Sequence, residues 1–207
     1  TLAERRFVGA FQILTSIYHD YDPHGFVDLE LRLQKSAGAG LHIDRGLVTI
    51  LDADASFRFR PYRGEQIRGT VEFNAGEFLI HDITGKHDGG TVVVNGRVLG
   101  TDRCAVCDIQ VHASDLPIDE MLYGAVPTTF VGAARDFQLA GRVGLAMSAA
   151  RSGCVDGHRG PWTSQTTVTL DDVAAEYVRF PYPVTDLRGQ ITFEGERLRL
   201  NSITGRH

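Results

Sequence analysis

The chain has 207 residues, 43% of them hydrophobic and 23% charged, which is ordinary for a globular domain large enough to bury a core. Its net charge is −5 and its Lys and Arg residues are scattered, which excludes the clustered basic surface that nucleic-acid binding requires. No apolar stretch approaches the roughly 18 residues of a membrane span. The sequence starts at Thr1 without a signal-like segment, so we expect any targeting or anchoring element to lie outside this fragment.

The first part of the chain predicts one helix and then a series of β-strands. A helix is expected from Leu2 to Ser16. From Val27 to Gln34, apolar and polar residues alternate, which predicts a strand with one apolar and one polar face. Residues 55–60 and 67–74 alternate in the same way, and Asn74-Ala75-Gly76 is typical of a hairpin connection to the next strand.

Cysteines in the middle of the chain have a Cys-x-x-Cys spacing that is also found in redox and metal sites. The alternation after Cys107 predicts a strand, however, and in an extended chain the Cα atoms of Cys104 and Cys107 would be roughly 10 Å apart, too far for a disulfide. We therefore expect both to be ordinary strand cysteines. Cys154 and His158 lie in an expected loop, but two candidate ligands do not make a zinc site, so no metal centre is predicted.

A short helix is predicted after this strand. Ser114-Asp115-Leu116-Pro117 combines a capping side chain with a proline near the first turn, and the helix should end at about Tyr123 or Gly124.

An internal repeat with an offset of 120 residues organises the whole chain. Residues 61–87 return as residues 181–207 without a gap, with nine of the 27 positions identical. Upstream, Gly25 corresponds to Gly141 at an offset of 116, so four extra residues are expected in the loop around Ser152 to Ser164. We therefore expect the sequence to hold one full unit and a truncated second one.

The repeat predicts four segments and an all-β fold. They are a leading helical segment (1–20), repeat unit 1 (21–115), a short helix with its connector (116–136), and repeat unit 2 (137–207). We expect an elongated antiparallel β structure, with one or two short helices between the repeats and the units joined in one sheet or packed end to end.

Catalytic motifs are not apparent in the sequence. It contains no nucleophile elbow, P-loop, dinucleotide-binding glycine motif after a strand, or H-E-x-x-H. His87 and His207 stand out, but they occupy the same repeat position after Thr-Gly, which favours a scaffold role for both. We predict no enzymatic activity, no catalytic residue and no cofactor.

The segment from Ala175 to His207, AEYVRFPYPVTDLRGQITFEGERLRLNSITGRH, resembles the recurrent motif of AsmA-like repeat proteins, the superfamily that includes TamB. The matching residues are Phe180, Pro181, Tyr182, Pro183, Gly189, Phe193, Leu198, Leu200 and Gly205. The first unit departs from it, with Arg60 in place of the Phe and Arg63 in place of the second Pro.

This resemblance implies an open, U-shaped β groove in a Gram-negative-type envelope, along which lipids move between membranes. It implies a periplasmic protein anchored to the inner membrane by a segment absent here, a phospholipid or other acyl-lipid cargo, and an outer-membrane partner protein. The predicted lining consists of the apolar sides of the alternating strands: Val27, Leu29, Leu31, Phe57, Phe59, Val71, Phe73, Ile191, Phe193, Leu198 and Leu200.

Two other functions fit the same pattern. The repeat could be an assembly scaffold whose open edge strand pairs with a client strand. It could also be a structural repeat of a cell-surface protein, with its apolar faces sealed against each other. For any single lining residue, ordinary core packing is an equally good interpretation.

Overall fold

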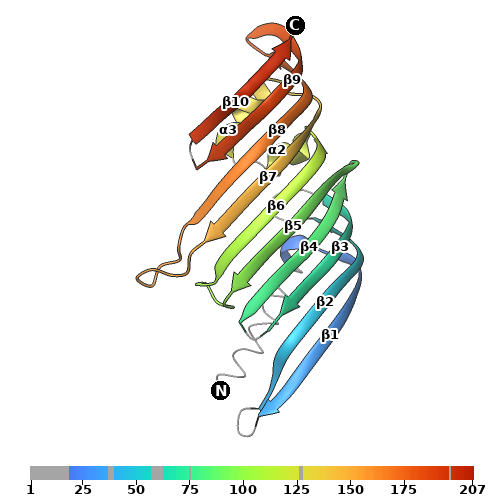
Figure 1. Cartoon of the computed structure of the whole chain (residues 1–207), viewed down its shortest axis with the longest axis vertical. Coiled ribbons are helices and arrows are strands. Elements are labelled where there is room, and N and C mark those ends of the chain that lie inside the picture. Colours follow the sequence, from blue (N-terminus) through green and yellow to red (C-terminus); the bar gives the residue numbers. More distant parts are fainter. Residues whose placement is uncertain (1–18, 37–39, 57–62, 75, 126–127, 196) are drawn as a thin grey trace.

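The computed structural model describes residues 19–36, 40–56, 63–74, 76–125, 128–195 and 197–207. Ten strands form one antiparallel sheet in which every strand pairs with its neighbours in the sequence, from β1 to β10 (Figure 1). The sheet is open, because β1 and β10 each pair with one neighbour among the described strands. The predicted all-β, elongated antiparallel fold is confirmed.

The strands form two groups around a helical connection. The first group is β1 (His24–Ser36), β2 (Gly40–Ser56), β3 (Arg63–Phe73), β4 (Glu77–His87), β5 (Gly90–Leu99) and β6 (Val106–Pro117). The connection holds α2 (Glu120–Ala125) and α3 (Thr128–Asp136). The second group is β7 (Arg142–Arg151), β8 (Trp162–Tyr177), β9 (Phe180–Glu194) and β10 (Arg197–Arg206).

The repeat of the sequence is visible in the strand register. Phe73 pairs with Phe78 and Val71 with Ile80 between β3 and β4. At an offset of 120, Phe193 pairs with Leu198 and Ile191 with Leu200 between β9 and β10. Strands β1–β4 therefore correspond to β7–β10, while β5 and β6 have no counterpart in the second group. The connection 152–161 between β7 and β8 lies where the sequence predicts the extra residues.

Bulges recur at equivalent positions and bend the strands. Asp82 in β4 and Ser202 in β10 both have positive φ and each adds one residue to its strand. Glycines at φ +144° and +132°, Gly69 and Gly189, face these bulges, and a Cβ on either would lie 2.7 Å from the carbonyl oxygen of Asp82 or Ser202. The close approach explains why glycine stands at this position in both units.

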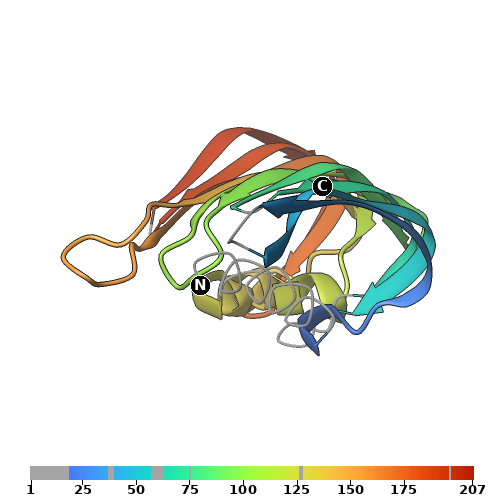
Figure 2. The same ribbon diagram turned by 90° about the horizontal axis from the view of Figure 1, so that it is seen from below.

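The sheet arches, and α2 and α3 lie on its concave side (Figure 2). Leu122 of α2 packs against Leu116, Val143, Leu170 and Val173 of the sheet, all of which are buried. A second buried cluster, Ile43, Phe73 and Phe78, lies in the first group of strands.

The start of the predicted helix is wrong. Residues 114–117 belong to β6, where Asp115 forms a bulge at φ 57° and Leu116 points into the core. The helix begins at Glu120 instead, because Asp119 supplies the cap by accepting a hydrogen bond from the backbone N–H of Leu122 at 2.7 Å. A second helix, α3, occupies what was predicted as connector. The helix expected from Leu2 to Ser16 lies outside the described residues.

Candidate functional site: the concave apolar face

One face of the sheet is apolar across all ten strands. Residues paired across antiparallel strands share a face, so the register identifies its members. One row runs Leu31, Gly46, Phe73, Phe78, Val98 and Cys107 from β1 to β6. Another runs Ile83, Val94, Val111, Met147, Thr166, Phe193 and Leu198 from β4 to β10. We call this surface the apolar face.

The apolar face is the concave one. Leu116, Val143 and Leu170 pair across β6, β7 and β8, and these side chains contact Leu122 of α2. Since α2 lies under the arch, the face that it contacts is the concave face (Figure 2).

The predicted lining residues that the structure describes lie together on this face. They are Val27, Leu29, Leu31, Val71, Phe73, Ile191, Phe193, Leu198 and Leu200. The remaining two, Phe57 and Phe59, lie outside the described residues. Apolar residues of β5 to β8 lie on the same face, between these two groups of lining residues. They were not predicted as lining from the sequence, although residues 91–98 and 143–149 carry some of the same alternation. These include Val92, Val94, Val98, Ile109, Val111, Leu145, Met147 and Val168.

The convex face is polar along the same strands. Between the apolar rows, Arg97 pairs with Asp108, Asn95 with Gln110, and Thr167 with Thr192. Ion pairs cross this face, such as Arg97 to Glu77 at 2.6 Å and Arg45 to Glu72 at 2.8 Å. A sheet with one polar and one apolar face has to cover the apolar face with protein or with another apolar partner.

Burial on the apolar face is uneven. Under α2, Val173 is fully buried and Val143 is 4% exposed. Toward the first edge, Leu29 on β1 is 54% exposed, and at the other edge Leu200 on β10 is 62% exposed. The covered part therefore packs as a core, while both edges present aliphatic side chains to their surroundings.

The prediction that Cys104 is an ordinary strand cysteine is wrong. Cys104 precedes β6 in the β5–β6 connection and forms a disulfide with Cys154 in the β7–β8 connection. The two loops meet because β6 and β7 are adjacent in the sheet, and Arg159 donates a further bond to the carbonyl oxygen of Arg103. The expectation that Cys104 is not bonded to Cys107 is confirmed, since Cys107 is a free, buried thiol on β6.

A buried arginine interrupts the apolar face near this disulfide. Arg151 on β7 is 8% exposed, donates to the carbonyl oxygen of Ala105 at 2.8 Å, and places its guanidinium 5.2 Å from the ring centre of Trp162. No carboxylate in the described part of the chain forms an ion pair with it. The backbone carbonyl and the indole ring satisfy the cation instead.

His87 ties the sheet to α2. One ring nitrogen lies 3.1 Å from a carboxylate oxygen of Asp119, and the other lies 3.0 Å from the carbonyl oxygen of Arg63. The same carboxylate group caps α2, so the histidine positions the helix over the apolar face. This geometry is that of a scaffold residue. His207, at the equivalent repeat position, is exposed and packs edge-on against Tyr182 at 5.0 Å between ring centres.

Titratable groups add little chemistry to this face. Burial raises the pKa of Tyr123 on α2, and the Glu120 carboxylate raises it further, against an opposing effect of Arg135. Burial, and then Asp20, raise the pKa of Tyr21. Both phenols stay neutral near pH 7. In the described ranges, three or more metal-ligating side chains do not come together anywhere, and no helix there has the length and hydropathy to cross a membrane.

Comparison with protein-family models, with curated protein sequences and with solved structures finds no significant match for this chain.

Proposed function

We propose that the concave apolar face binds acyl chains and forms part of a path along which lipids move between membranes. The observation that carries this proposal is the pair of overlapping, mainly apolar rows, one from β1 to β6 and one from β4 to β10, on a face that ends at both edges in exposed aliphatic side chains such as Leu29 and Leu200. Such a surface needs no catalytic group, because burying each CH₂ contributes about 0.8 kcal/mol.

The residues of the apolar face would also allow a bound acyl chain to move along it. Most neighbouring positions on the face are aliphatic, so an acyl chain that slides by one strand spacing exchanges similar contacts over most of the face, and the barriers between those positions stay low. The cargo that fits is a phospholipid or another acyl lipid. On this proposal the protein acts in a cell envelope, where it contacts membranes and an outer-membrane partner protein.

The disulfide supports an extracytoplasmic location. Cys104 and Cys154 are bonded, and such bonds persist in oxidising compartments such as the periplasm.

Charged substitutions at the exposed ends of the face test the proposal. Leu29→Asp and Leu200→Asp should leave the fold intact, because both side chains are more than half exposed, while an acyl chain crossing them would have to desolvate a carboxylate. Capture of a photo-crosslinking phospholipid should fall strongly in both variants, with melting temperatures close to that of the wild type.

Matched controls lie on the polar face of the same strands. Gln34→Asp on β1 and Asn201→Asp on β10 add the same charge to exposed positions on the convex side and should leave lipid capture unchanged. If the wild-type chain captures no lipid, or if the control variants lose as much lipid capture as the test variants, the proposal that the apolar face binds lipids is wrong. In that case the sheet is a structural repeat.

A further inference from the structure

A buried arginine continues one row of the apolar face. The row that runs from Phe78 through Val98 reaches Cys107 on β6. Cys107 pairs with Arg151 on β7, which in turn pairs with Trp162 on β8. Side chains that pair across antiparallel strands share a face. The guanidinium of Arg151 therefore lies on the apolar face, at the end of β7, where this face reaches its rim (Figure 1).

Neutral groups surround this cation. In the described residues, Nε and Nη2 of Arg151 donate to the carbonyl oxygen of Ala105, at 3.2 and 2.8 Å, and Nη2 lies 3.6 Å from the sulfur of Cys107. The guanidinium also lies 5.2 Å from the ring centre of Trp162. A carbonyl dipole and an aromatic ring solvate a positive charge, but they do not neutralise it.

One end of the guanidinium remains available for a ligand. Its Nη1 carries two N–H groups, and the hydrogen bonds of Arg151 to the residues that the structure describes come from Nε and Nη2 instead. Nη1 is not sealed from solvent, although Arg151 as a whole is only 8% exposed. A buried cation with unused, accessible donors favours an anionic ligand, because a charge removed from bulk water is stabilised by an opposite charge that hydrogen-bonds to it.

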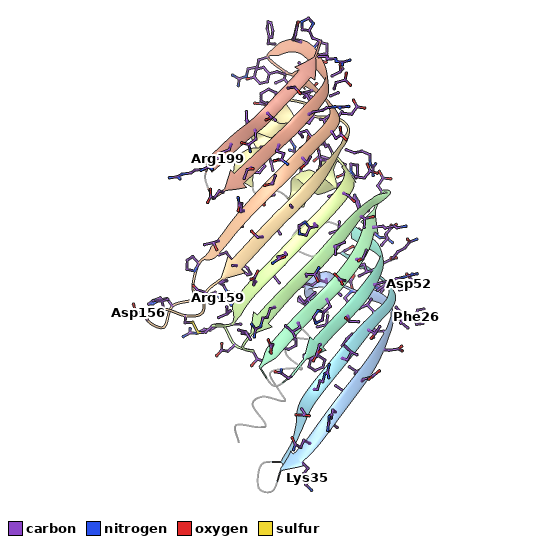
Figure 3. All side chains as sticks on the ribbon, viewed as in Figure 1. Phe26, Lys35, Asp52, Asp156, Arg159 and Arg199 are labelled. Carbon is purple, nitrogen blue, oxygen red and sulfur yellow. A yellow bond between two sulfur atoms is a disulfide. The ribbon has the colours of Figure 1, made fainter. Side chains whose placement is uncertain are left out.

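The first repeat unit also has a cation at this position. At the offset of 116 that relates β1 to β7, Arg151 corresponds to Lys35. Lys35 follows Leu31 and Leu33 in the alternation of β1, so it belongs to the apolar face as well. Figure 3 shows Lys35 at the end of β1, and the end of β7 lies along the same rim of the sheet (Figure 1). Both units thus place a positive charge where the apolar face meets the rim.

Two further arginines lie in the loops at this end of β7. Arg103 is in the β5–β6 connection and Arg159 is in the β7–β8 connection, and the disulfide joins these two loops. Arg159 donates to the carbonyl oxygen of Arg103 at 3.1 Å, and Arg103 donates to a carbonyl oxygen of the other loop at 3.4 Å. Asp102 and Asp156 in the same loops offset only part of the positive charge. The rim therefore attracts anions to Arg151.

We propose that Arg151 binds the phosphate group of a phospholipid whose acyl chains lie on the apolar face. This assignment rests on the proposed function and adds to it a defined headgroup site. The phosphate accepts hydrogen bonds from Nη1 at the rim, and the acyl chains follow the row toward Val98 and Phe78. The indole of Trp162, which is 53% exposed, contacts the glycerol region, as amphipathic tryptophans do at membrane interfaces.

Two photo-crosslinking lipids that differ only in their headgroup test the proposal. One is a phosphatidylglycerol and the other is the diacylglycerol with the same acyl chains, and both are delivered to the intact chain in a nonionic detergent. We expect about tenfold greater capture of the phosphatidylglycerol, because its phosphate adds charge-assisted hydrogen bonds to the same apolar contacts. Inorganic phosphate at the concentration of the lipid should not reduce this capture. If it does, the site binds free phosphate and the headgroup assignment is wrong.

Substitutions of Arg151 separate ligand binding from a structural role. Arg151→Gln keeps a donor for the carbonyl oxygen of Ala105 but removes the charge, so it should capture both lipids equally. Arg151→Lys keeps the charge and should keep most of the preference for phosphatidylglycerol. The matched control is Arg199→Gln, which removes an exposed arginine from the polar face of β10 and should keep the full preference. Melting temperatures of all three variants report whether the fold is retained.

The outcomes separate this proposal from the proposed function. If the wild-type chain captures both lipids equally, or if Arg199→Gln loses as much of the preference as Arg151→Gln, the headgroup site is wrong while the lipid-binding face stands. If the wild-type chain captures neither lipid, both proposals fail. The comparison of the two lipids on the wild-type chain needs no variant, so it decides the question even if Arg151→Gln does not fold.

Discussion

The two repeat units place similar residues in opposite environments. Phe78 on β4 is 4% exposed, whereas its equivalent Leu198 on β10 is 47% exposed. His87 is buried against Asp119, whereas His207 is exposed against Tyr182. In each pair, the first residue has β5 beyond it, and His87 also contacts Asp119 at the start of α2, whereas the second has no strand beyond it among the described residues. Burial at a repeat position is therefore decided by the neighbouring element rather than by the residue.

Truncating Phe78 and its equivalent Leu198 should show the largest difference between the two units in the loss of unfolding free energy. We expect Phe78→Ala to lower the free energy of unfolding by about 3–5 kcal/mol, because it leaves a cavity beside Phe73. Leu198→Ala should lower it by no more than about 1 kcal/mol, because half of the side chain is already exposed. Urea denaturation of both variants measures the difference, and equal losses would mean that β10 is covered in solution.

Loss of the disulfide should weaken the connection between the units. The bond joins the β5–β6 loop to the β7–β8 loop across 50 residues, so Cys104→Ser or a reducing agent should cost about 2–4 kcal/mol. Cys107→Ala, which leaves the bond intact, should retain the dependence of the melting temperature on reductant. Thermal unfolding with and without dithiothreitol is the measurement. A wild-type melting temperature that reductant does not change would contradict the predicted contribution of the bond.

The two histidine positions should respond differently to loss of their contacts. Asp119→Ala removes both the cap of α2 and the partner of His87, and should cost about 1–2 kcal/mol. His207→Ala removes one exposed ring contact and should change stability by less than about 0.5 kcal/mol. Hydrogen exchange at the amide of Leu122 should be faster in Asp119→Ala alone. Unchanged exchange there would show that the helix is held by packing instead.

Much of the fold could be predicted from local sequence. The alternation from Val27 to Gln34 and from Ile67 to Asn74 places apolar residues on one face of any antiparallel sheet, because side chains along a strand point to opposite faces in turn. The 120-residue offset then predicts that strands of the second unit repeat those of the first. The same two patterns are why the proposed lining residues could be named before the register was known.

The cysteines and the helix start could not be predicted in this way. The alternation that begins at Cys107 suggested a strand that also held Cys104, but the chain turns before β6, and Cys154 reaches Cys104 only because β6 and β7 are adjacent. Likewise, Ser114 to Pro117 has the composition of a helix start, yet β7 pairs with Leu116 and Pro117 and extends β6 through Pro117. In both cases a partner distant in sequence outweighed the local pattern.

The sequence by itself determined which side chains share a face and which positions repeat, since both follow from the period of two and from the offset of 120. The tertiary structure alone decided which part of that face is sealed. Leu122 of α2 covers Val143 and Leu170, while Leu29 and Leu200 stay exposed at the edges. The physical reason is that burial is a property of pairs of elements, and no local pattern records which element lies opposite.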